Sequence, residues 1–556
     1  MNQNLKRFFS IAAFLCTAIT TTVNSSCSSC PTGCTNSQNL LQPHALSVSA
    51  SRQLELIKNA WAPMPDEEGW FGMFGVGVEY MNTIGTKKCD TKVKSCCTSI
   101  GSMPFWSGTN TTSSTEGFAT YSNTMSLGNN TGGFDLDAYQ MGLGPVTTNG
   151  TVTINPIMFQ AGADFMLYFG AHRTERGFWF KIHGPVGVTR VKPNLTFSET
   201  VTPVEYPLGS LSLTDTTKAP YSNIAEAFDG QNSAGFLQKM LRGRISNCKT
   251  SSAHFGDPEF SLGYNVWAEE TKNLGIALCF SAPTGNKARA IQVLEPIFGR
   301  NGHWAAGGEL LGHWRFLQSE DNDNMYADLW LEGTVMHLFR SCHERSFDLK
   351  ANGAGSKYLL LGKYTGGTFQ NIIENAVNIT TMTVESTFSV EGDFALAADF
   401  HWKNWSIMIG YEGWGRTCES LYVDTAPGST NLNDYAVLGR QTAYTTGGAV
   451  LNNCEPLAQI GNSQIQYNST STRPTGIADA TVATNRIPED IFTALDVNNQ
   501  CAHAAYTSKP FIQAQYTWTE SDFRPFLGIS GAAEISNMKN SAASFWSVGA
   551  QGGISF

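Results

Sequence analysis

The amino-acid sequence predicts an all-β protein, a transmembrane antiparallel β-barrel of about 14 strands, within a range of roughly 12 to 16. Three observations lead to this prediction. Apolar and polar residues alternate along many segments, which is typical of strands with one apolar and one polar face. Charged residues make up only 15% of the chain, while glycines number 54. After residue 25, no uninterrupted apolar stretch has the length of a membrane helix.

The N-terminus has the pattern of a secretory signal peptide, which we place at residues 1–25. Two basic residues precede an apolar run from Phe8 to Ile19, and small residues follow at the cleavage position. Cleavage before Cys27, as in a lipoprotein, is the weaker alternative because Asn24 and Ser26 fit that signal poorly. The chain is therefore expected to be exported.

A leader at 26–69 precedes the barrel, which is expected to span 70–556. The leader contains one helical candidate from Leu46 to Ala60, which prolines end. A second helical patch covers 224–245. Either helix could plug the barrel, whereas a surface or periplasmic helix is the simpler alternative.

The clearest pair of strands surrounds the turn Lys403-Asn404. Apolar and polar residues alternate along 387–402, and the alternation resumes along 404–416. Long alternating strands joined by a tight turn indicate a hairpin. Trp402 and Trp405 flank this turn, where an aromatic girdle at the boundary of lipid and water would place them.

The same alternation recurs along the chain and gives about 14 candidate strands, an even number as in bacterial single-chain barrels. The candidates are 70–80, 134–144, 155–170, 177–191, 257–269, 272–283, 303–318, 324–340, 357–364, 387–402, 404–416, 509–520, 523–535 and 542–556. Counted back from a periplasmic C-terminus, long loops near 81–133 and 417–508 would lie outside the cell. The segments 192–256 and 284–302 would then lie in the periplasm, where turns should be short. This conflict indicates a misassigned strand or two, or an inward-folded 192–256.

The last candidate strand carries no charge up to the final residue of the chain. Its apolar face includes Trp546, Ile554 and Phe556. In a closed barrel this strand would pair with the first one. The ending resembles the C-terminal signature of Gram-negative outer-membrane β-barrels, which finish in an aromatic residue, usually Phe. The resemblance implies that the barrel assembly machinery reads these three residues as an insertion signal, and that the protein is porin-like and resides in the cell outer membrane.

The cysteines favour disulfides over a metal site. Of the 13 cysteines, Cys16 lies in the signal peptide, which leaves an even number for an oxidising compartment. Bridges in the long loops would brace segments that have no core. The candidates there are Cys89, Cys96, Cys97, Cys418, Cys454 and Cys501. Cys27, Cys30 and Cys34 have the spacing of half a zinc site, but no second half follows, so no metal is expected.

Charged residues on the candidate strands fall on one face, as expected if the other face meets lipid. Acidic residues are in excess in this set, so an open lumen would mildly favour cations. The alternative is that these charges pair with one another and fill a closed lumen. The predicted pore-lining residues are Asp164, Lys181, Glu269, Glu309, Arg315, Asp328, Glu332, Glu391, Asp393, Asp399, Glu412, Arg416, Arg524 and Glu534.

The sequence therefore predicts a porin-like channel for passive diffusion of small polar solutes. Two alternatives stay open: a plugged transporter for apolar ligands, or a surface-exposed adhesin or structural protein that displays loops. An enzyme is not expected, although Asp399 and His401 share one face, because no Gly-x-Ser-x-Gly motif occurs.

The expected partners are outer-membrane lipid, the barrel assembly machinery and small solutes or ions. A homo-oligomer is left open, and no cofactor is expected. The net charge of −10 argues against a nucleic-acid partner.

Overall fold

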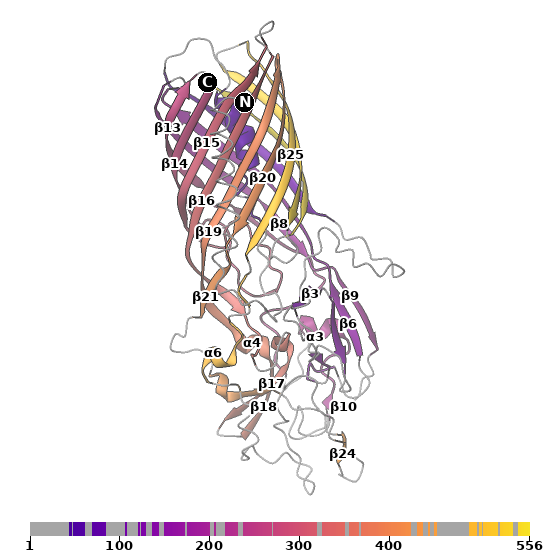
Figure 1. The fold of residues 1–556 in the computed structure, drawn as a ribbon. Helices are drawn as coiled ribbons and strands as arrows, with labels where there is room; N and C mark the ends of the chain where they lie inside the picture. The colour runs from indigo at the N-terminus through magenta and orange to yellow at the C-terminus, as the bar shows by residue number, and fades with distance from the viewer. Residues whose placement is uncertain are drawn as a thin grey trace, which may run out of the picture.

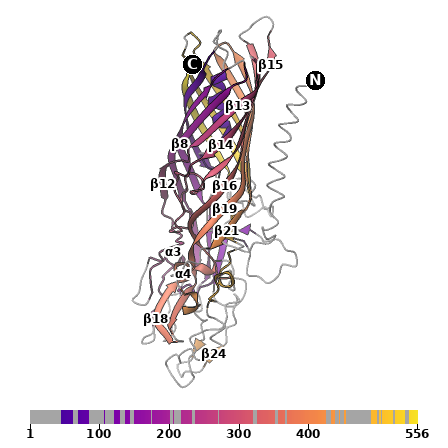
Figure 2. The same ribbon diagram turned by 90° about the vertical axis from the view of Figure 1, so that its left-hand side faces the viewer.

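A computed structural model shows a β-barrel at one end of the molecule and a folded region built from long connections at the other (Figures 1 and 2). The predicted signal peptide at 1–25 lies outside the described residues. The structure describes residues 44–46, 48–61, 69–84, 106–107, 121–122, 124–128, 136–138, 140–143, 149–172, 175–200, 205–206, 217–231, 237–269, 271–319, 325–350, 355–365, 368–423, 431–437, 443–444, 450–452, 487, 489–497, 500–502, 504–520, 523–536 and 543–556.

Within these residues, 12 antiparallel strands close into a barrel, which confirms the predicted fold class. Each strand pairs with its neighbour along the chain, and the last pairs with the first. The predicted closure is confirmed in register, since Ile554 lies opposite Phe74 and Trp546 opposite Asn82. The barrel strands are β1 (Phe71–Thr83), β7 (Ile157–Gly170), β8 (Phe178–Lys192), β13 (Glu259–Glu269), β14 (Lys272–Ser281), β15 (Ala305–Gln318), β16 (Met325–Ser346), β19 (Thr381–Trp402), β20 (Trp405–Arg416), β25 (Ala505–Thr517), β26 (Arg524–Ser536) and β27 (Phe545–Ser555).

Two candidate strands lie outside the barrel. Among the described residues of the candidate 134–144, only β5 (Leu136–Asp137) is a strand, and it pairs with β4 (Thr124–Gly128) in a separate sheet. The candidate 357–364 overlaps β17 (Leu360–Thr365), which belongs to a small sheet of its own. Both are short apolar segments that enter an apolar core, where alternation does not report a lipid-facing side.

Removal of these two strands resolves the conflict over the long segments. Every short turn between barrel strands now lies at one end, together with the last residue of β27; these turns are 171–177, 270–271, 319–324, 403–404 and 518–523. Short turns mark the periplasmic end of an outer-membrane barrel, and long loops mark the extracellular end. The described residues of 192–256 and the segment 284–302 therefore lie at the extracellular end, and their periplasmic placement was wrong.

The outer surface of the barrel is apolar. Along β20, Ile407, Ile409 and Tyr411 are exposed, while the residues between them face inward. Trp402 and Trp405 are 55% and 53% exposed beside the periplasmic turn 403–404, as a girdle requires. Since such a surface would be unfavourable in water, the pattern indicates contact with lipid. No helix among the described residues is long and apolar enough to cross a membrane.

The extracellular region contains small sheets and short helices around its own core. β16 and β19 continue beyond the barrel into this region, where β21 (Glu419–Val423) pairs with β19 (Figure 2). β12 (Thr250–Phe255) pairs with β8. The remaining elements are β2 (Trp106–Ser107), β3 (Tyr121–Ser122), β6 (Asn149–Ile154), β9 (Leu195–Thr200), β10 (Glu205–Tyr206), β11 (Thr217–Lys218), α3 (Ile224–Asp229), η2 (Ser356–Tyr358), β18 (Thr368–Asn375), α4 (Ala376–Thr380), η3 (Leu432–Asp434), β22 (Tyr435–Val437), β23 (Ala443–Tyr444), β24 (Val450–Asn452) and α6 (Ile491–Ala494).

The core of this region is apolar. Phe228 and Tyr358 meet edge to face with their ring centroids 4.8 Å apart, and both are fully buried. Leu237 and Met240 pack in the same cluster. The described residues of the helical patch predicted at 224–245 therefore form α3 and part of this core, outside the lumen.

The cysteine predictions are only partly covered by the described residues. Cys248, Cys279 and Cys342 have free thiols. Cys27, Cys30, Cys34, Cys89, Cys96, Cys97 and Cys454 lie outside the described residues. The bracing of loops by disulfides therefore stays a prediction.

Candidate functional site: the plugged lumen

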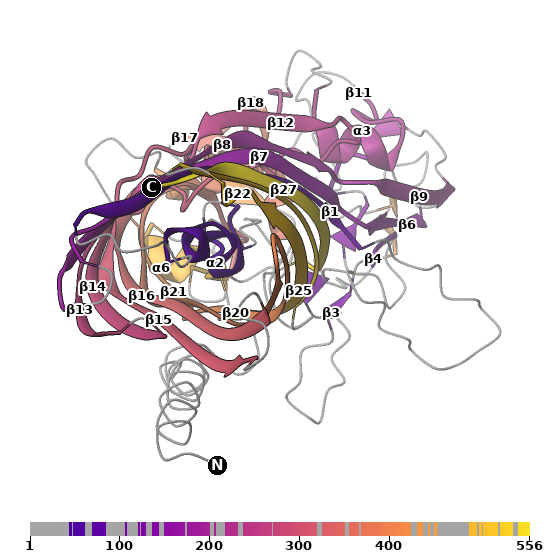
Figure 3. The ribbon, with the colours of Figure 1, turned by 90° about the horizontal axis from the view of Figure 1, so that it is seen from above.

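A segment of the leader lies inside the barrel (Figure 3). We call the described residues of 44–61 the plug. It contains α2 (Ala50–Ile57) and a following 3-10 helix, η1 (Lys58–Trp61). The Ser49 hydroxyl caps α2 by accepting the backbone N–H of Arg52. Every residue of both helices is buried, so their polar side chains must find partners on the barrel wall.

Two cations of the plug pair with carboxylates of the wall. Arg52 donates from Nη1 to Glu79 Oε2 over 2.7 Å and from Nε to Asp164 Oδ2 over 3.2 Å. Lys58 Nζ lies 2.9 Å from Asp399 Oδ2. Buried ions are stable only when they are paired and hydrogen-bonded, so each pair fixes the plug against a particular strand.

The N-terminus of α2 is also satisfied by the wall. The backbone N–H of Ala50 donates to Asp393 Oδ2 over 2.6 Å, and that of Ser51 donates to Glu412 Oε2 over 3.2 Å. The first N–H groups of a helix have no partner within the helix, and carboxylates are favoured at its positive end. The two acids therefore hold the start of α2 in the lumen.

Further contacts join the plug to the wall on other sides. Lys181 Nζ donates to Gln53 Oε1 of the plug over 2.7 Å and to Glu309 and Glu332 of the wall over 2.6 and 2.8 Å. The amide of Gln515 donates to Asn59 Oδ1 over 2.6 Å. The plug is thus hydrogen-bonded to β1, β7, β8, β19, β20 and β25.

An apolar layer surrounds the C-terminal half of the plug near the periplasmic end. Trp61 packs against Phe71 with ring centroids 4.9 Å apart. Gly263 leaves room for the ring of Trp179, which a Cβ at that position would overlap. The layer includes Leu54, Leu56, Ile57, Ala60 and Trp61 of the plug and Phe71, Met73, Met166, Tyr168, Trp179, Leu311, Trp330, Met408, Phe511 and Phe526 of the wall.

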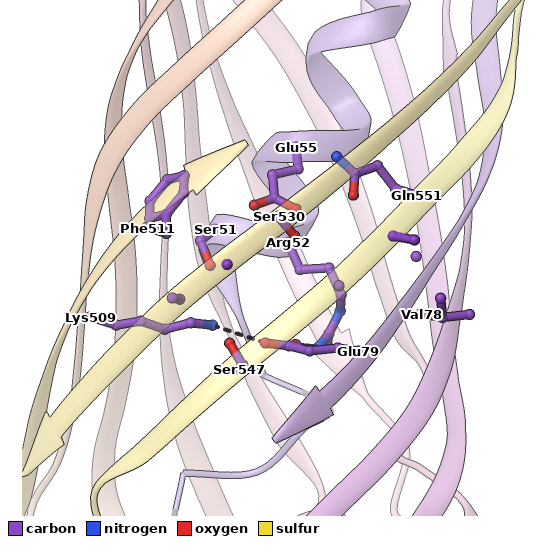
Figure 4. A pocket seen from close by; sticks show the side chains of 15 residues that line it. Ser51, Arg52, Glu55, Val78, Glu79, Lys509, Phe511, Ser530, Ser547 and Gln551 are labelled. Carbon is purple, nitrogen blue, oxygen red and sulfur yellow. Dashed lines mark hydrogen bonds and ion pairs between the residues drawn. The ribbon is translucent and has the colours of Figure 1, made fainter. Parts of the chain in front are cut away.

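A narrow cleft runs between α2 and the wall formed by β1, β25, β26 and β27. Figure 4 shows Lys509 and Glu79 facing each other across it, with Arg52 and Glu55 of α2 alongside. Lys509 Nζ lies 3.7 Å from Glu79 Oε1. The cleft has room for about one water molecule, so it does not form a continuous path for a solute.

Most of the predicted pore-lining residues are buried in the barrel, and several of them form ion pairs. Arg315 donates to Asp328 over 2.9 Å, and Glu391 accepts from Arg300 over 2.7 Å. The remaining buried members are Asp164, Lys181, Glu309, Glu332, Asp393, Asp399, Glu412, Arg416, Arg524 and Glu534. Whether they line a path for solutes stays a prediction, because many of them contact the plug in this structure.

Glu269 is the member of the predicted set that does not face the lumen. Its side chain is 51% exposed and pairs with Lys272 across the periplasmic turn. A register shift between Asn265 and Trp267 interrupts the alternation of β13. Since a bulge moves all later side chains of a strand to the other face, Glu269 points outward.

Sequence reasoning missed several charged residues of the lumen. Glu79 and Lys509 lie on the wall, and His44, Arg52 and Lys58 lie on the plug. The alternation of β1 could have revealed Glu79, because its neighbours on either side are exposed. The plug residues carry no such signal, since a helical period does not tell whether the helix lies in a lumen or on a surface.

Comparisons with known proteins give only distant likenesses. Neither a family model nor a curated protein matches the sequence. A Pseudomonas aeruginosa FadL homologue is 9% identical with a TM-score of 0.22, and the match covers 88% of this chain and 90% of that one. The toluene transporter TodX of P. putida is 8% identical with a TM-score of 0.19, and the match covers 94% of this chain and 98% of that one. The outer-membrane channel DcaP of Acinetobacter baumannii is 9% identical with a TM-score of 0.16, and the match covers 89% of this chain and all of that one.

Because these TM-scores are low, the assignment of the fold rests on the barrel itself. The barrel is closed, its outer surface is apolar, and its short turns and long loops lie at opposite ends. The chain is an outer-membrane β-barrel protein, of the kind found in the Gram-negative outer membrane, and its N-terminal plug fills its own lumen.

Proposed function

We propose that the protein is an outer-membrane transporter whose plug closes the lumen at rest and shifts to let a ligand pass. The observation that carries this proposal is the complete burial of α2 and η1 inside the barrel. An open porin keeps a water-filled lumen, which the plug occupies here. The structure therefore favours the plugged-transporter alternative over the open porin that the sequence predicts.

The apolar layer supports an apolar ligand. In an open water-filled channel, Met166, Trp330 and Phe511 would face water, at a cost of about 25 cal/mol for each Å² of apolar surface exposed. If the plug shifts, the same layer offers a binding surface to an apolar ligand. The layer is therefore better suited to an apolar ligand than to a small polar solute.

The contacts of the plug fit a part that moves as a unit. Its ion pairs join it to strands distant in sequence, and no plug strand pairs with the wall among the described residues. A ligand that supplies new contacts could offset the loss of these pairs, because it shifts the equilibrium by its differential affinity for the two positions. The charged wall residues that lose their plug partners would then be hydrated.

The proposal is tested by uptake into intact Gram-negative cells whose outer membrane contains the full chain. We expect entry of the apolar dye N-phenylnaphthylamine to rise above that in cells without the chain. In proteoliposomes we expect no swelling in arabinose, a small polar solute. Swelling in arabinose at the rate of an open porin, without faster dye entry, would contradict the proposal and restore the open channel.

Loop display is a second candidate function, which the apolar core of the extracellular region supports. A barrel that only displays this region would show neither dye entry nor swelling, and its binding would depend on the extracellular region. Cleavage after residue 25, reading of Trp546, Ile554 and Phe556 by the assembly machinery, and disulfide bracing remain proposals for the same protein.

A further inference from the structure

Three buried side chains gather where the plug meets the wall, and one atom of each lacks a hydrogen-bond partner. The atoms are His44 Nε2, Asp393 Oδ1 and Glu412 Oε1. The three residues are 2%, 2% and 0% exposed, and their potential ligand atoms lie within 4.8 Å of one another. Since buried polar atoms are rarely left without a partner, the cluster is a candidate for binding a ligand.

The second polar atom of each of these side chains is held in place. His44 Nδ1 lies 2.8 Å from Glu534 Oε1. Asp393 Oδ2 accepts the N–H of Ala50, and Glu412 Oε2 accepts that of Ser51. In the tautomer whose only ring proton is on Nδ1 and directed at Glu534, Nε2 presents its lone pair to the two carboxylates. A metal-ligating histidine commonly has such a carboxylate behind it, which fixes its tautomer and ring orientation.

The charge around the cluster also favours a cation. Asp393, Glu412 and Glu534 bring three carboxylates together, and Lys509 Nζ lies 3.2 Å from Glu412 Oε2. One lysine does not balance three carboxylates in a site that excludes water. A divalent cation at the unpartnered atoms would supply the missing charge.

We propose that His44, Asp393 and Glu412 form a Zn²⁺ site that fastens the plug to the wall. One imidazole nitrogen and two carboxylate oxygens are ligands that Zn²⁺ accepts, and a water molecule could complete the tetrahedron. Donor atoms around tetrahedral Zn²⁺ lie about 3.4 Å apart. His44 Nε2 and Glu412 Oε1 are 3.8 Å apart, and the three ligand atoms lie within 4.8 Å of one another, so side-chain rotations would bring them to the distances that Zn²⁺ requires.

The location of the ligands couples the cation to the plug. His44 belongs to the plug, whereas Asp393 lies on β19 and Glu412 on β20. The cation can bind all three only while the plug is seated, so binding would stabilise the closed lumen by linkage. The site does not depend on the proposed transport, because it can be measured in a barrel that carries nothing.

The experiment uses the purified full chain in detergent, stripped with a chelator and titrated with Zn²⁺ by calorimetry. We expect His44→Gln and Asp393→Asn each to weaken this binding by more than the roughly 10- to 100-fold loss typical of an outer-shell change such as Glu534→Gln. The matched control is His313→Gln, which removes another buried histidine beside a carboxylate, Asp328, and should leave binding unchanged.

Two further readouts identify the ligand atoms and the effect of the cation on the plug. Absorption of bound Co²⁺ distinguishes the proposed nitrogen and oxygen ligands from cysteine thiolates, which add charge-transfer bands. We expect Zn²⁺ to slow the hydrogen exchange of α2 in the wild type. In the folded His44→Gln variant, Zn²⁺ should not slow it. Equal Zn²⁺ binding by wild type and His44→Gln would overturn the proposal. Absence of binding would overturn it too, and would leave a protonated His44 paired with Glu534 and Glu412.

Discussion

The lumen combines buried ion pairs with an apolar layer, whereas the core of the extracellular region is mainly apolar. In the lumen, buried ion pairs such as those of Arg52 and Lys58 with the wall hold the plug alongside the apolar layer. The extracellular region is held by apolar side chains such as Phe228 and Tyr358. An apolar core is lost only by unfolding, whereas a layer of ion pairs can separate and become hydrated. The difference indicates that the plug is the part that moves and the extracellular region the part that stays folded.

The largest expected effect comes from truncating the apolar core. Phe228→Ala should destabilise the extracellular region by about 3–5 kcal/mol, because it removes a fully buried ring and leaves a cavity. Proteolysis of the extracellular region should accelerate, while the barrel remains folded. Phe492→Ala is the control, since that ring is 44% exposed and should change the free energy of unfolding by less than about 0.5 kcal/mol. Equal effects of the two changes would show that no such core exists.

The next prediction compares loss of one member of the ion pair between Lys58 and Asp399 with loss of both. Lys58→Met leaves Asp399 with His401, 3.0 Å away, and should destabilise the seated plug by about 3 kcal/mol. Adding Asp399→Asn should recover much of that loss, because the buried charge is then gone. Hydrogen exchange of α2 measures both the loss in Lys58→Met and the recovery when Asp399→Asn is added. Additive losses in the double variant would indicate that the two side chains do not interact.

A buried amine in the extracellular region should oppose its stability. Lys357 Nζ is buried without a hydrogen-bond partner among the described residues, so Lys357→Met should stabilise the region by about 1–3 kcal/mol. Burial lowers the pKa of Lys357. The unfolded chain then binds the proton more tightly, so the wild type gains stability as the pH rises toward the ordinary lysine pKa.

The stability of the Lys357→Met variant should not rise with pH in this way. Urea unfolding of the extracellular region at two pH values checks both statements. A variant that is less stable than the wild type, or that keeps the same pH dependence, would refute this account of Lys357.

The smallest effects compare one kind of helix cap in the two regions. Ser49→Ala should cost α2 about 1 kcal/mol, and Asn223→Ala should cost α3 a similar amount, because each side chain accepts an N–H of the first turn. The two variants should differ in which region of the molecule is destabilised. Ser49→Ala should raise hydrogen exchange in the plug alone, and Asn223→Ala in the extracellular region alone. Changes in both regions from either variant would show that they unfold together.

The barrel was predictable because its strands alternate over long segments. The hairpin around 403–404 needed no information beyond the sequence. Glu269 was misplaced because a bulge depends on how β13 pairs with β14, which the local pattern does not contain. The candidates 134–144 and 357–364 failed because short apolar segments look alike in a barrel wall and in an apolar core.

The plug shows where sequence reasoning ends. The helix from Leu46 to Ala60 was expected, and α2 with η1 occupies most of that range. Its seat in the lumen depends on partners such as Asp164 and Asp399, which lie far along the chain. No local pattern links Arg52 or Lys58 to these carboxylates. The candidate site therefore required the three-dimensional structure.

Single-channel conductance in a planar bilayer tests the central claim, that the plug closes the lumen, most directly. The comparison is between the full chain and a variant that lacks residues 44–61. We expect the full chain to insert and stay closed, and the shortened chain to give stable open steps, because removal of the plug leaves a water-filled barrel. Steady open conductance of the full chain, equal to that of the shortened chain, would contradict the account.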